Sequence, residues 1–167
     1  MQENVQLLQK IGETLTARGL FLCTAESCTG GLLSHIITNL PGASDFYLGG
    51  QVTYSNVAKQ HWLRVPASTI SRHGAVSEET VLAMAQGIRA AFALDISLQK
   101  LVGISISGIA GPTGGSPQKP VGTVWIGISM PDYDHAYHKL FHGDRAAVKS
   151  QSAHQALVLL LQVLTLK

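Results

Sequence analysis

The sequence predicts an α/β fold, in which helices pack against a mixed β-sheet within a single domain spanning 1–167. Three observations predict it. Apolar residues recur at helical spacing in several segments, and short apolar runs of strand length separate those segments. Near the end of the chain, two runs of strand type follow each other closely enough to form a hairpin.

The first half of the chain is expected to alternate helices and strands. The first helix carries Val5, Leu8, Ile11 and Leu15 on one face and stops at Gly19. The expected elements are a helix over 5–18, a buried strand over 20–24, a helix over 32–40, a strand over 51–54 and a helix over 56–63.

The second half begins with a helix capped by Ser77, because Glu78 and Glu79 then lie near the positive end of its dipole. Asp144 is the expected cap of the last helix. The expected elements are a helix from 78 to about 94, strands over 101–107, 121–130 and 136–141, a turn at 131–132 and a helix over 145–164. The loop over 108–120 is long for a compact domain, and such loops are more often functional than incidental.

Composition excludes several classes of protein. The chain is 46% hydrophobic and 13% charged, which is typical of a globular domain. Its twelve basic residues are scattered among ten acidic ones, which argues against direct nucleic-acid binding. The first residues lack the pattern of a signal peptide, and the apolar stretch over 156–166 is too short to span a bilayer. We therefore expect a cytoplasmic protein without membrane contact. Cys23 and Cys28 do not make a disulfide framework.

Ser27 lies in the segment Ala-Glu-Ser-Cys-Thr-Gly-Gly (25–31), between an apolar strand and a helix. Its hydroxyl would point off the carboxyl edge of the sheet, where open α/β sheets form crevices. Free amides at the helix start, from Thr29 to Gly31, would face the same space and stabilise an oxyanion. Spacing alone equally allows Ser27 or Thr29 to be only a helix cap.

A serine nucleophile needs a base, and no Ser-His-Asp set is recognisable. Tyr54 and Lys59 converge if Tyr54 ends a strand and Lys59 lies on the helix after it. A nearby ammonium favours the tyrosinate, which could take the serine proton. A packed ring and a solvated lysine are the plain alternative.

The glycine-rich loop over 108–120 offers many backbone amides of the kind that cradle phosphates or carboxylates. It lacks the ending of a Walker loop and the spacing of a dinucleotide fingerprint, so a plain connector remains the alternative. Arg145 could reach an anionic ligand or pair with Asp45 or Asp144. His135, His138 and His142 do not share one strand face, so we expect no metal site.

Taken together, these segments resemble the CinA carboxy-terminal domain family. The resemblance covers about residues 5–163. It rests on seven motifs in order: AESCTGG (25–31), PGAS (41–44), VTYSNVAK (52–59), HGAVS (73–77), SGIAGP (107–112), KPVGTV (119–124) and GDR (143–145).

The resemblance implies a three-layer α/β/α sandwich with a mixed, mainly parallel sheet. It also implies a nicotinamide-nucleotide amidase that converts nicotinamide mononucleotide (NMN) to nicotinic acid mononucleotide and ammonia, in pyridine-nucleotide recycling. The chain looks like the standalone form, without a pyrophosphatase domain, and a homo-oligomer is expected. No cofactor or metal is implied. The implied catalytic residues are Ser27, Tyr54 and Lys59, and the substrate-binding residues are Thr29, Gly30, Gly31, Ser107, Gly108, Gly111, Gly114 and Arg145.

The chain departs from the usual family pattern at Ser107, Gln118 and the pair 61–62, none of which is a proposed catalytic group. The expected mechanism has Lys59 keep Tyr54 basic, Tyr54 deprotonate Ser27, and the turn amides hold the oxyanion. Three alternatives stay open: a non-catalytic nucleotide-binding paralogue, an amidase or esterase for another small substrate, and a DNA-associated protein.

Overall fold

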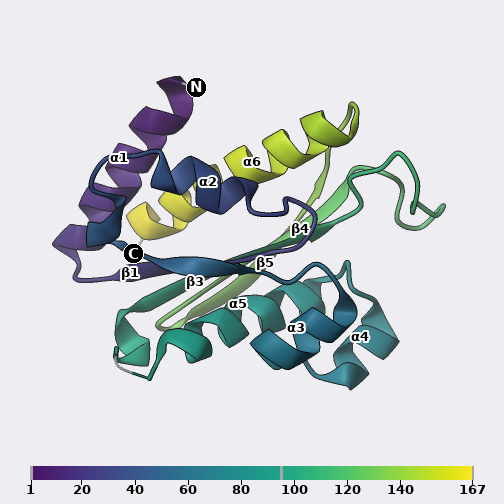
Figure 1. The fold of residues 1–167 in the computed structure, drawn as a ribbon, viewed down its shortest axis with the longest axis horizontal. Helices are drawn as coiled ribbons and strands as arrows, with labels where there is room; N and C mark the ends of the chain where they lie inside the picture. The colour runs from purple at the N-terminus through teal and green to yellow at the C-terminus, as the bar shows by residue number, and fades with distance from the viewer. Residues whose placement is uncertain (1, 95, 167) are drawn as a thin grey trace.

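A computed structural model of the chain describes residues 2–94 and 96–166, which build one sheet covered by helices (Figure 1). In chain order the helices and strands are α1 (Gln2–Ala17), β1 (Phe21–Glu26), α2 (Leu32–Thr38), β2 (Tyr47–Val52), α3 (Asn56–Leu63), α4 (Ala67–His73), α5 (Glu78–Phe92), β3 (Leu101–Gly108), β4 (Thr123–Met130), β5 (Tyr133–Leu140) and α6 (Arg145–Leu166).

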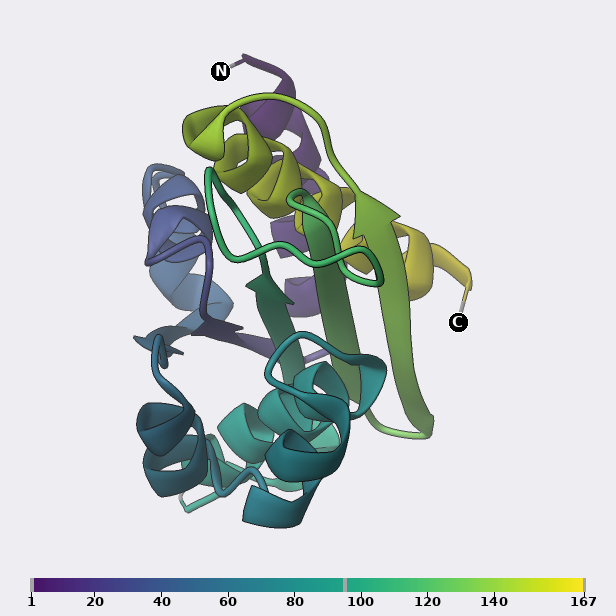
Figure 2. The same ribbon diagram turned by 90° about the vertical axis from the view of Figure 1, so that its right-hand side faces the viewer.

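The sheet has the strand order β2-β1-β3-β4-β5. β1 pairs in parallel with both of its neighbours, whereas β4 runs antiparallel to both of its own, so four of the five strands point the same way. α1, α2 and α6 cover one face, and α3, α4 and α5 cover the other (Figures 1 and 2). The predicted three-layer α/β arrangement with a mixed sheet is confirmed.

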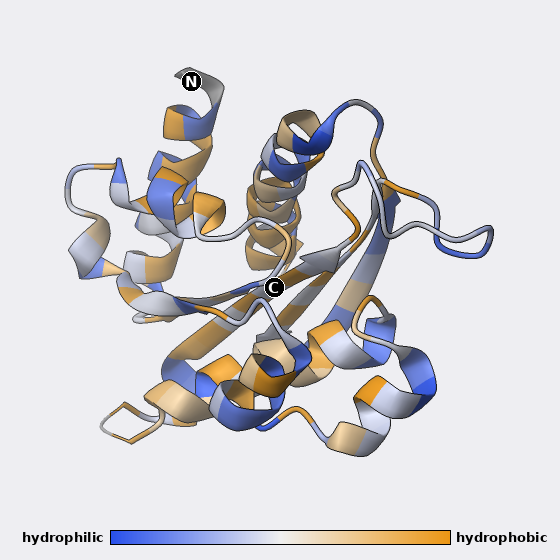
Figure 3. Ribbon diagram, turned by 45° about the vertical axis from the view of Figure 1, so that its right-hand side comes forward, coloured by the Kyte–Doolittle hydropathy of each residue, from blue (hydrophilic) through white to orange (hydrophobic). Residues whose placement is uncertain are grey.

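The core lies on both faces of the sheet, and hydrophobic residues concentrate along its central strands (Figure 3). Leu8, Ile11 and Leu15 of α1 are buried beside α6, as their helical spacing predicted. On the other face, Met84 and Ile88 of α5 pack against β1. Fully burying one such side chain contributes roughly 1.5–3 kcal/mol. The two faces together fix the sheet between its helices.

Two elements differ from the sequence-based expectation. β2 spans Tyr47–Val52 rather than 51–54, so Tyr54 lies two residues beyond its end. Its first half was not predicted, because Gly49 and Gly50 weaken the strand pattern. A Cβ at Gly50 would overlap the Thr24 hydroxyl, so the strand needs glycine to approach β1. α4 was not predicted, since only Ile70 of this polar helix is buried.

The remaining differences are shifts of element ends. β1 runs one residue later at its start and two residues further at its end than expected, and α2 ends at Thr38 rather than at residue 40. The expected strand over 136–141 begins instead at Tyr133, directly after the turn at Pro131-Asp132. Asp132 adopts a left-handed conformation (φ 58°), which tightens that hairpin.

Candidate active site

Three parallel strands end at one edge of the sheet, and polar residues follow each of them. Ser27 follows β1, Thr53 and Tyr54 follow β2, and Ser107 and Gly108 close β3. The chain leaves β1 for β2 on one side and later returns to β3 on the other, so the strand order reverses at β1. Crevices open at such switch points in α/β sheets.

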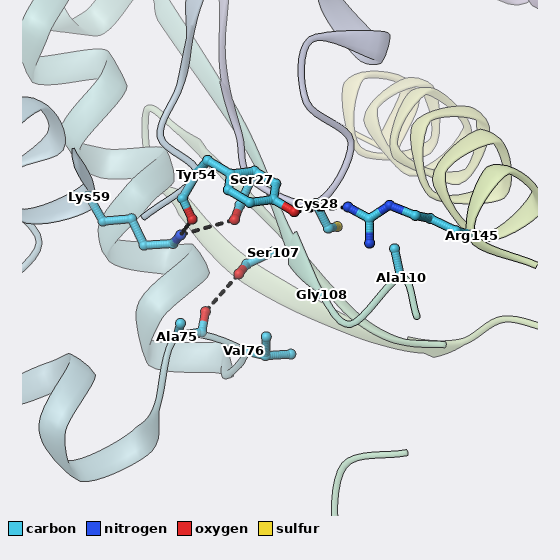
Figure 4. A pocket seen from close by; sticks show the side chains of 10 residues that line it. All are labelled: Ser27, Cys28, Tyr54, Lys59, Ala75, Val76, Ser107, Gly108, Ala110 and Arg145. Carbon is cyan, nitrogen blue, oxygen red and sulfur yellow. Dashed lines mark hydrogen bonds between the residues drawn. The ribbon is translucent and has the colours of Figure 1, made fainter. Parts of the chain in front are cut away.

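A pocket of about 220 Å³ opens at this edge (Figure 4). Six of the predicted site residues line it: Ser27, Tyr54, Lys59, Ser107, Gly108 and Arg145. The lining is completed by Cys28, Ala75, Val76 and Ala110. The structure thus brings together residues from three strand ends, from α3 and from the start of α6.

Lys59 lies directly against Ser27. Its side chain is 1% exposed, and its Nζ donates to Ser27 Oγ at 3.0 Å (Figure 4). The same Nζ donates to the backbone carbonyls of Thr53 at 2.9 Å and Tyr54 at 3.3 Å. Ser55 caps α3, which carries Lys59, through the Ala58 amide. The sequence-based expectation placed the Tyr54 side chain between Lys59 and Ser27, whereas the structure brings the lysine and the serine into direct contact.

The surroundings of Lys59 shift its protonation equilibrium towards the neutral amine. Burial lowers the pKa of Lys59 to about 8. No carboxylate among the described residues forms an ion pair with it. A neutral amine has two N–H groups and one lone pair. The two N–H groups can donate hydrogen bonds to the carbonyls of Thr53 and Tyr54. That lone pair then faces Ser27 Oγ and can accept the hydroxyl proton.

Tyr54 differs from its expected place. Its hydroxyl accepts a hydrogen bond from Arg145 Nη2 at 2.8 Å, and its side chain is 60% exposed. Lys59 meets the Tyr54 carbonyl and not its hydroxyl. The expected proton relay from Ser27 through the Tyr54 hydroxyl is absent from this geometry. Arg145 also donates to the Gly111 carbonyl at 2.8 Å, which ties the glycine-rich loop to the pocket mouth.

The turn after Ser27 also corrects an expectation. The Gly31 amide donates to Glu26 Oε2 at 2.9 Å, and the Gly30 amide donates to the Ser27 carbonyl at 3.1 Å. Neither of these two amides is free for an oxyanion. The amides of Cys28 and Thr29 donate to no other residue of the described chain, and they directly follow Ser27.

Glu26 is the residue that accepts hydrogen bonds from the backbone amides at the start of α2. Its carboxylate is fully buried and accepts from the amides of Gly31, Leu33 and Ser34 and from the Ser34 hydroxyl, at 2.7 to 3.0 Å. Gly31 adopts φ 95°, which glycine allows and which turns the chain into α2. Sequence reasoning missed Glu26, although it lies in the same segment as Ser27.

The other predicted binding residues divide into two groups. Ser107 lines the pocket, but its hydroxyl donates to the Ala75 carbonyl at 2.7 Å and so fixes the pocket wall. Gly114 lies outside the lining, as do Thr29, Gly30, Gly31 and Gly111.

Cys28 carries a further nucleophilic side chain in the pocket. Burial raises the pKa of its thiol to about 12, so the thiol stays protonated and is a poor nucleophile. Ser27 is the candidate nucleophile, because the Lys59 amine lies beside its hydroxyl.

Residues 2–94 and 96–166 hold neither a metal-ligand cluster nor a membrane-spanning helix. No three His, Cys, Asp or Glu side chains gather there in a way that would hold a metal ion. None of the helices in those ranges combines the length and apolar character that crossing a bilayer requires.

Comparison with known proteins gives the chain its family. The family model of the CinA C-terminal domain matches residues 4–164. A CinA-like protein of Syntrophotalea carbinolica is 46% identical over 151 residues, but the chain spans only 35% of that relative's length. The nicotinamide-nucleotide amidohydrolase PncC of Escherichia coli K12 is 44% identical over 161 residues, which are 96% of this chain and 94% of that protein.

Solved structures agree with the sequence comparison. The competence damage-inducible protein A (ComA) of Klebsiella pneumoniae superposes with a TM-score of 0.89 at 36% identity, over 97% of each chain. A competence or damage-inducible protein of Enterobacter asburiae gives a TM-score of 0.88 at 38% identity, over 96% of this chain and 98% of that one. Because the family model matches nearly the whole chain, the chain belongs to the CinA C-terminal domain family.

Proposed function

We propose that this protein is a nicotinamide-nucleotide amidohydrolase, which hydrolyses NMN to nicotinic acid mononucleotide and ammonia. The observation that carries the proposal is the 3.0 Å contact between buried Lys59 Nζ and Ser27 Oγ in a pocket. The substrate comes from similarity, because relatives covered over nearly their full length are named nicotinamide-nucleotide amidohydrolase PncC. This activity would place the chain in pyridine-nucleotide recycling.

In the first half-reaction, neutral Lys59 takes the proton of Ser27 as the serine oxygen attacks the carboxamide carbon. The carbonyl oxygen becomes an oxyanion. The amides of Cys28 and Thr29, which directly follow Ser27 in the chain, stabilise it by hydrogen bonds. The carbon–nitrogen bond then breaks, and Lys59 returns its proton to the leaving group, which departs as ammonia. An acyl ester on Ser27 remains.

In the second half-reaction, a water replaces ammonia beside Lys59. Lys59 takes one proton from this water as its oxygen attacks the ester carbon, and it returns that proton to Ser27 Oγ as the ester bond breaks. The products are the free serine and the carboxylic acid of nicotinic acid mononucleotide, which releases its remaining proton to solvent and becomes the carboxylate. Lys59 thus acts in turn as base and acid, and Ser27 is regenerated.

Tyr54 and Arg145 are proposed to bind substrate at the pocket mouth. The hydrogen bond between them joins the segment after β2 to the start of α6 across the opening. Tyr54 can lay its exposed ring against the pyridine or ribose, and Arg145 contributes positive charge. In this assignment Tyr54 contacts substrate but takes no proton from Ser27.

The test is ammonia release from NMN by the purified protein, measured beside Ser27→Ala. We expect turnover by the wild type and a loss of roughly 10⁴-fold or more in the variant, as for other enzymes deprived of their nucleophile. Wild-type turnover by Ser27→Ala would refute the nucleophile. Binding of NMN without ammonia release would identify a non-catalytic paralogue, and release from other amides but not NMN would identify a different substrate.

A further inference from the structure

The pocket at Ser27 is too small to enclose a whole mononucleotide. Its volume of about 220 Å³ falls below the roughly 300–1,000 Å³ of sites that enclose a drug-sized ligand. With the carboxamide at Ser27, the pyridine ring fills the pocket. The ribose phosphate must then lie outside the lining, where a cation would be needed to bind it.

Three of the cations near the pocket are already engaged. Lys59 donates to Ser27 and two carbonyls, and Arg145 donates to the Gly111 carbonyl and the Tyr54 hydroxyl. Lys119 donates to the carbonyls of His73 and Val76 behind the pocket wall. Each of these side chains has a structural or catalytic task in the chain itself.

Lys149 is different. It lies on α6, four residues after Arg145, so the two side chains share one face of the helix. It is half-buried, and its Nζ has no acceptor and no ion-pair partner among the residues that the structure describes.

The position of this ammonium links it to the active-site turn. A Cβ placed on Gly30 would lie 3.6 Å from Lys149 Nζ, so the ammonium lies over the turn that follows Ser27. Its charge also reaches the thiol of Cys28 in the pocket lining, where it opposes the larger effect of burial on the pKa of that thiol. Gly30 leaves this space open, because it has no side chain to occupy it.

We propose that Lys149 binds the phosphate of the mononucleotide and makes the enzyme prefer nucleotides to the corresponding nucleosides. The inference rests on the proposed function for the identity of the substrate, and it names the residue that selects it. A phosphate beside Gly30 would receive a charge-assisted hydrogen bond from Lys149 and lie on the same side as Arg145. Nothing in this assignment gives Lys149 a part in the chemical step.

The experiment measures binding of nicotinic acid mononucleotide by calorimetry, since this product carries the phosphate and cannot be deamidated. The variants are Lys149→Met, which removes the charge, and Lys149→Arg, which retains it. Lys10→Met on the exposed side of α1 is the control for loss of one positive charge. We expect Kd to rise about tenfold in Lys149→Met, the order expected for one charge-assisted hydrogen bond, and to stay within threefold in the other two.

Kinetics on NMN provide the second readout. Lys149→Met should raise KM about tenfold and leave kcat within threefold, because only binding is affected. An unchanged Kd and KM, or an equal loss in Lys10→Met, would overturn the role of Lys149. If the wild type binds the product in a Lys149-dependent way but releases no ammonia, the amidase proposal fails and this one stands. If the wild type turns over NMN and Lys149→Met matches it, only this inference fails.

Discussion

Two buried charged side chains flank Ser27, and their surroundings are opposite. Glu26, at the end of β1, is 0% exposed and accepts four hydrogen bonds from the start of α2. Lys59, on α3, is 1% exposed and meets two neutral carbonyls and a serine hydroxyl. Glu26 is fully compensated by hydrogen-bond donors, whereas Lys59 has only neutral partners for its charge.

This contrast separates an anchoring residue from a reactive one. A carboxylate with all its partners in place stabilises the turn and holds α2 at the sheet edge. An amine whose burial lowers its pKa to about 8 is ready to exchange a proton near neutral pH. Burial alone therefore does not distinguish the proposed base from the anchoring carboxylate; the partners of the two buried charges do.

The largest effect is expected from removing the amine of Lys59, the reactive residue of the pair. Lys59→Met keeps the apolar stem and removes the amine, so Ser27 loses its base. We expect kcat/KM for ammonia release to fall roughly 10²–10⁴-fold. Thermal stability should not fall, because a buried amine with neutral partners is replaced by an apolar group.

Lys10→Met is the matched control, since Lys10 is exposed on α1. It should show wild-type kinetics. A Lys59→Met enzyme with more than a tenth of wild-type kcat/KM would remove Lys59 from the mechanism.

The second prediction concerns Glu26, the anchoring residue of the pair. Glu26→Gln places amide N–H groups where the α2 amides need an acceptor, which leaves buried donors unsatisfied. We expect the free energy of unfolding to fall by roughly 1–3 kcal/mol. Chemical denaturation at constant pH measures this loss. Glu13→Gln, at an exposed site on α1, should change stability by less than about 0.5 kcal/mol; equal losses in both variants would contradict the anchoring role.

The smallest effect sharpens the assignment of the base. Tyr54→Phe removes only the hydroxyl that Arg145 contacts. We expect less than a tenfold loss of kcat/KM, expressed mainly in KM, because no proton passes through this group. A loss of 10²-fold or more in kcat would restore Tyr54 as the base, since that is the range for a general base.

The sequence predicted the fold well where a regular apolar pattern existed. The spacing of Leu8, Ile11 and Leu15 identified α1, and the isoleucine-rich run identified β3. The pattern failed where tertiary contacts decide the structure. β2 contains two glycines and is held by its pairing with β1, and polar α4 is held through a single buried isoleucine.

The candidate site was also predictable only in part. Ser27, Tyr54, Lys59 and Arg145 were singled out from the sequence, and the structure places all four around one pocket. Their partners were not predictable, because hydrogen bonds to backbone amides and carbonyls leave no trace in residue type. For that reason the Lys59 contact with the Tyr54 carbonyl was missed, as was the use of helix-start amides by buried Glu26.

The lowered pKa of Lys59 also makes the stability of the fold depend on pH. The pKa of Lys59 is lower in the folded chain than its ordinary value of 10.5, so the unfolded chain binds the proton more tightly. The contribution of Lys59 to stability therefore rises as the pH increases from about 8 to 10.5.

The central claim is that neutral Lys59 deprotonates Ser27, and the pH dependence of kcat/KM for NMN tests it most directly. We predict that log(kcat/KM) rises with a slope near one below about pH 8, the pKa of Lys59, and levels off above it as the amine becomes neutral. A profile that stays flat between about pH 6 and 9 in an active enzyme would contradict the claim.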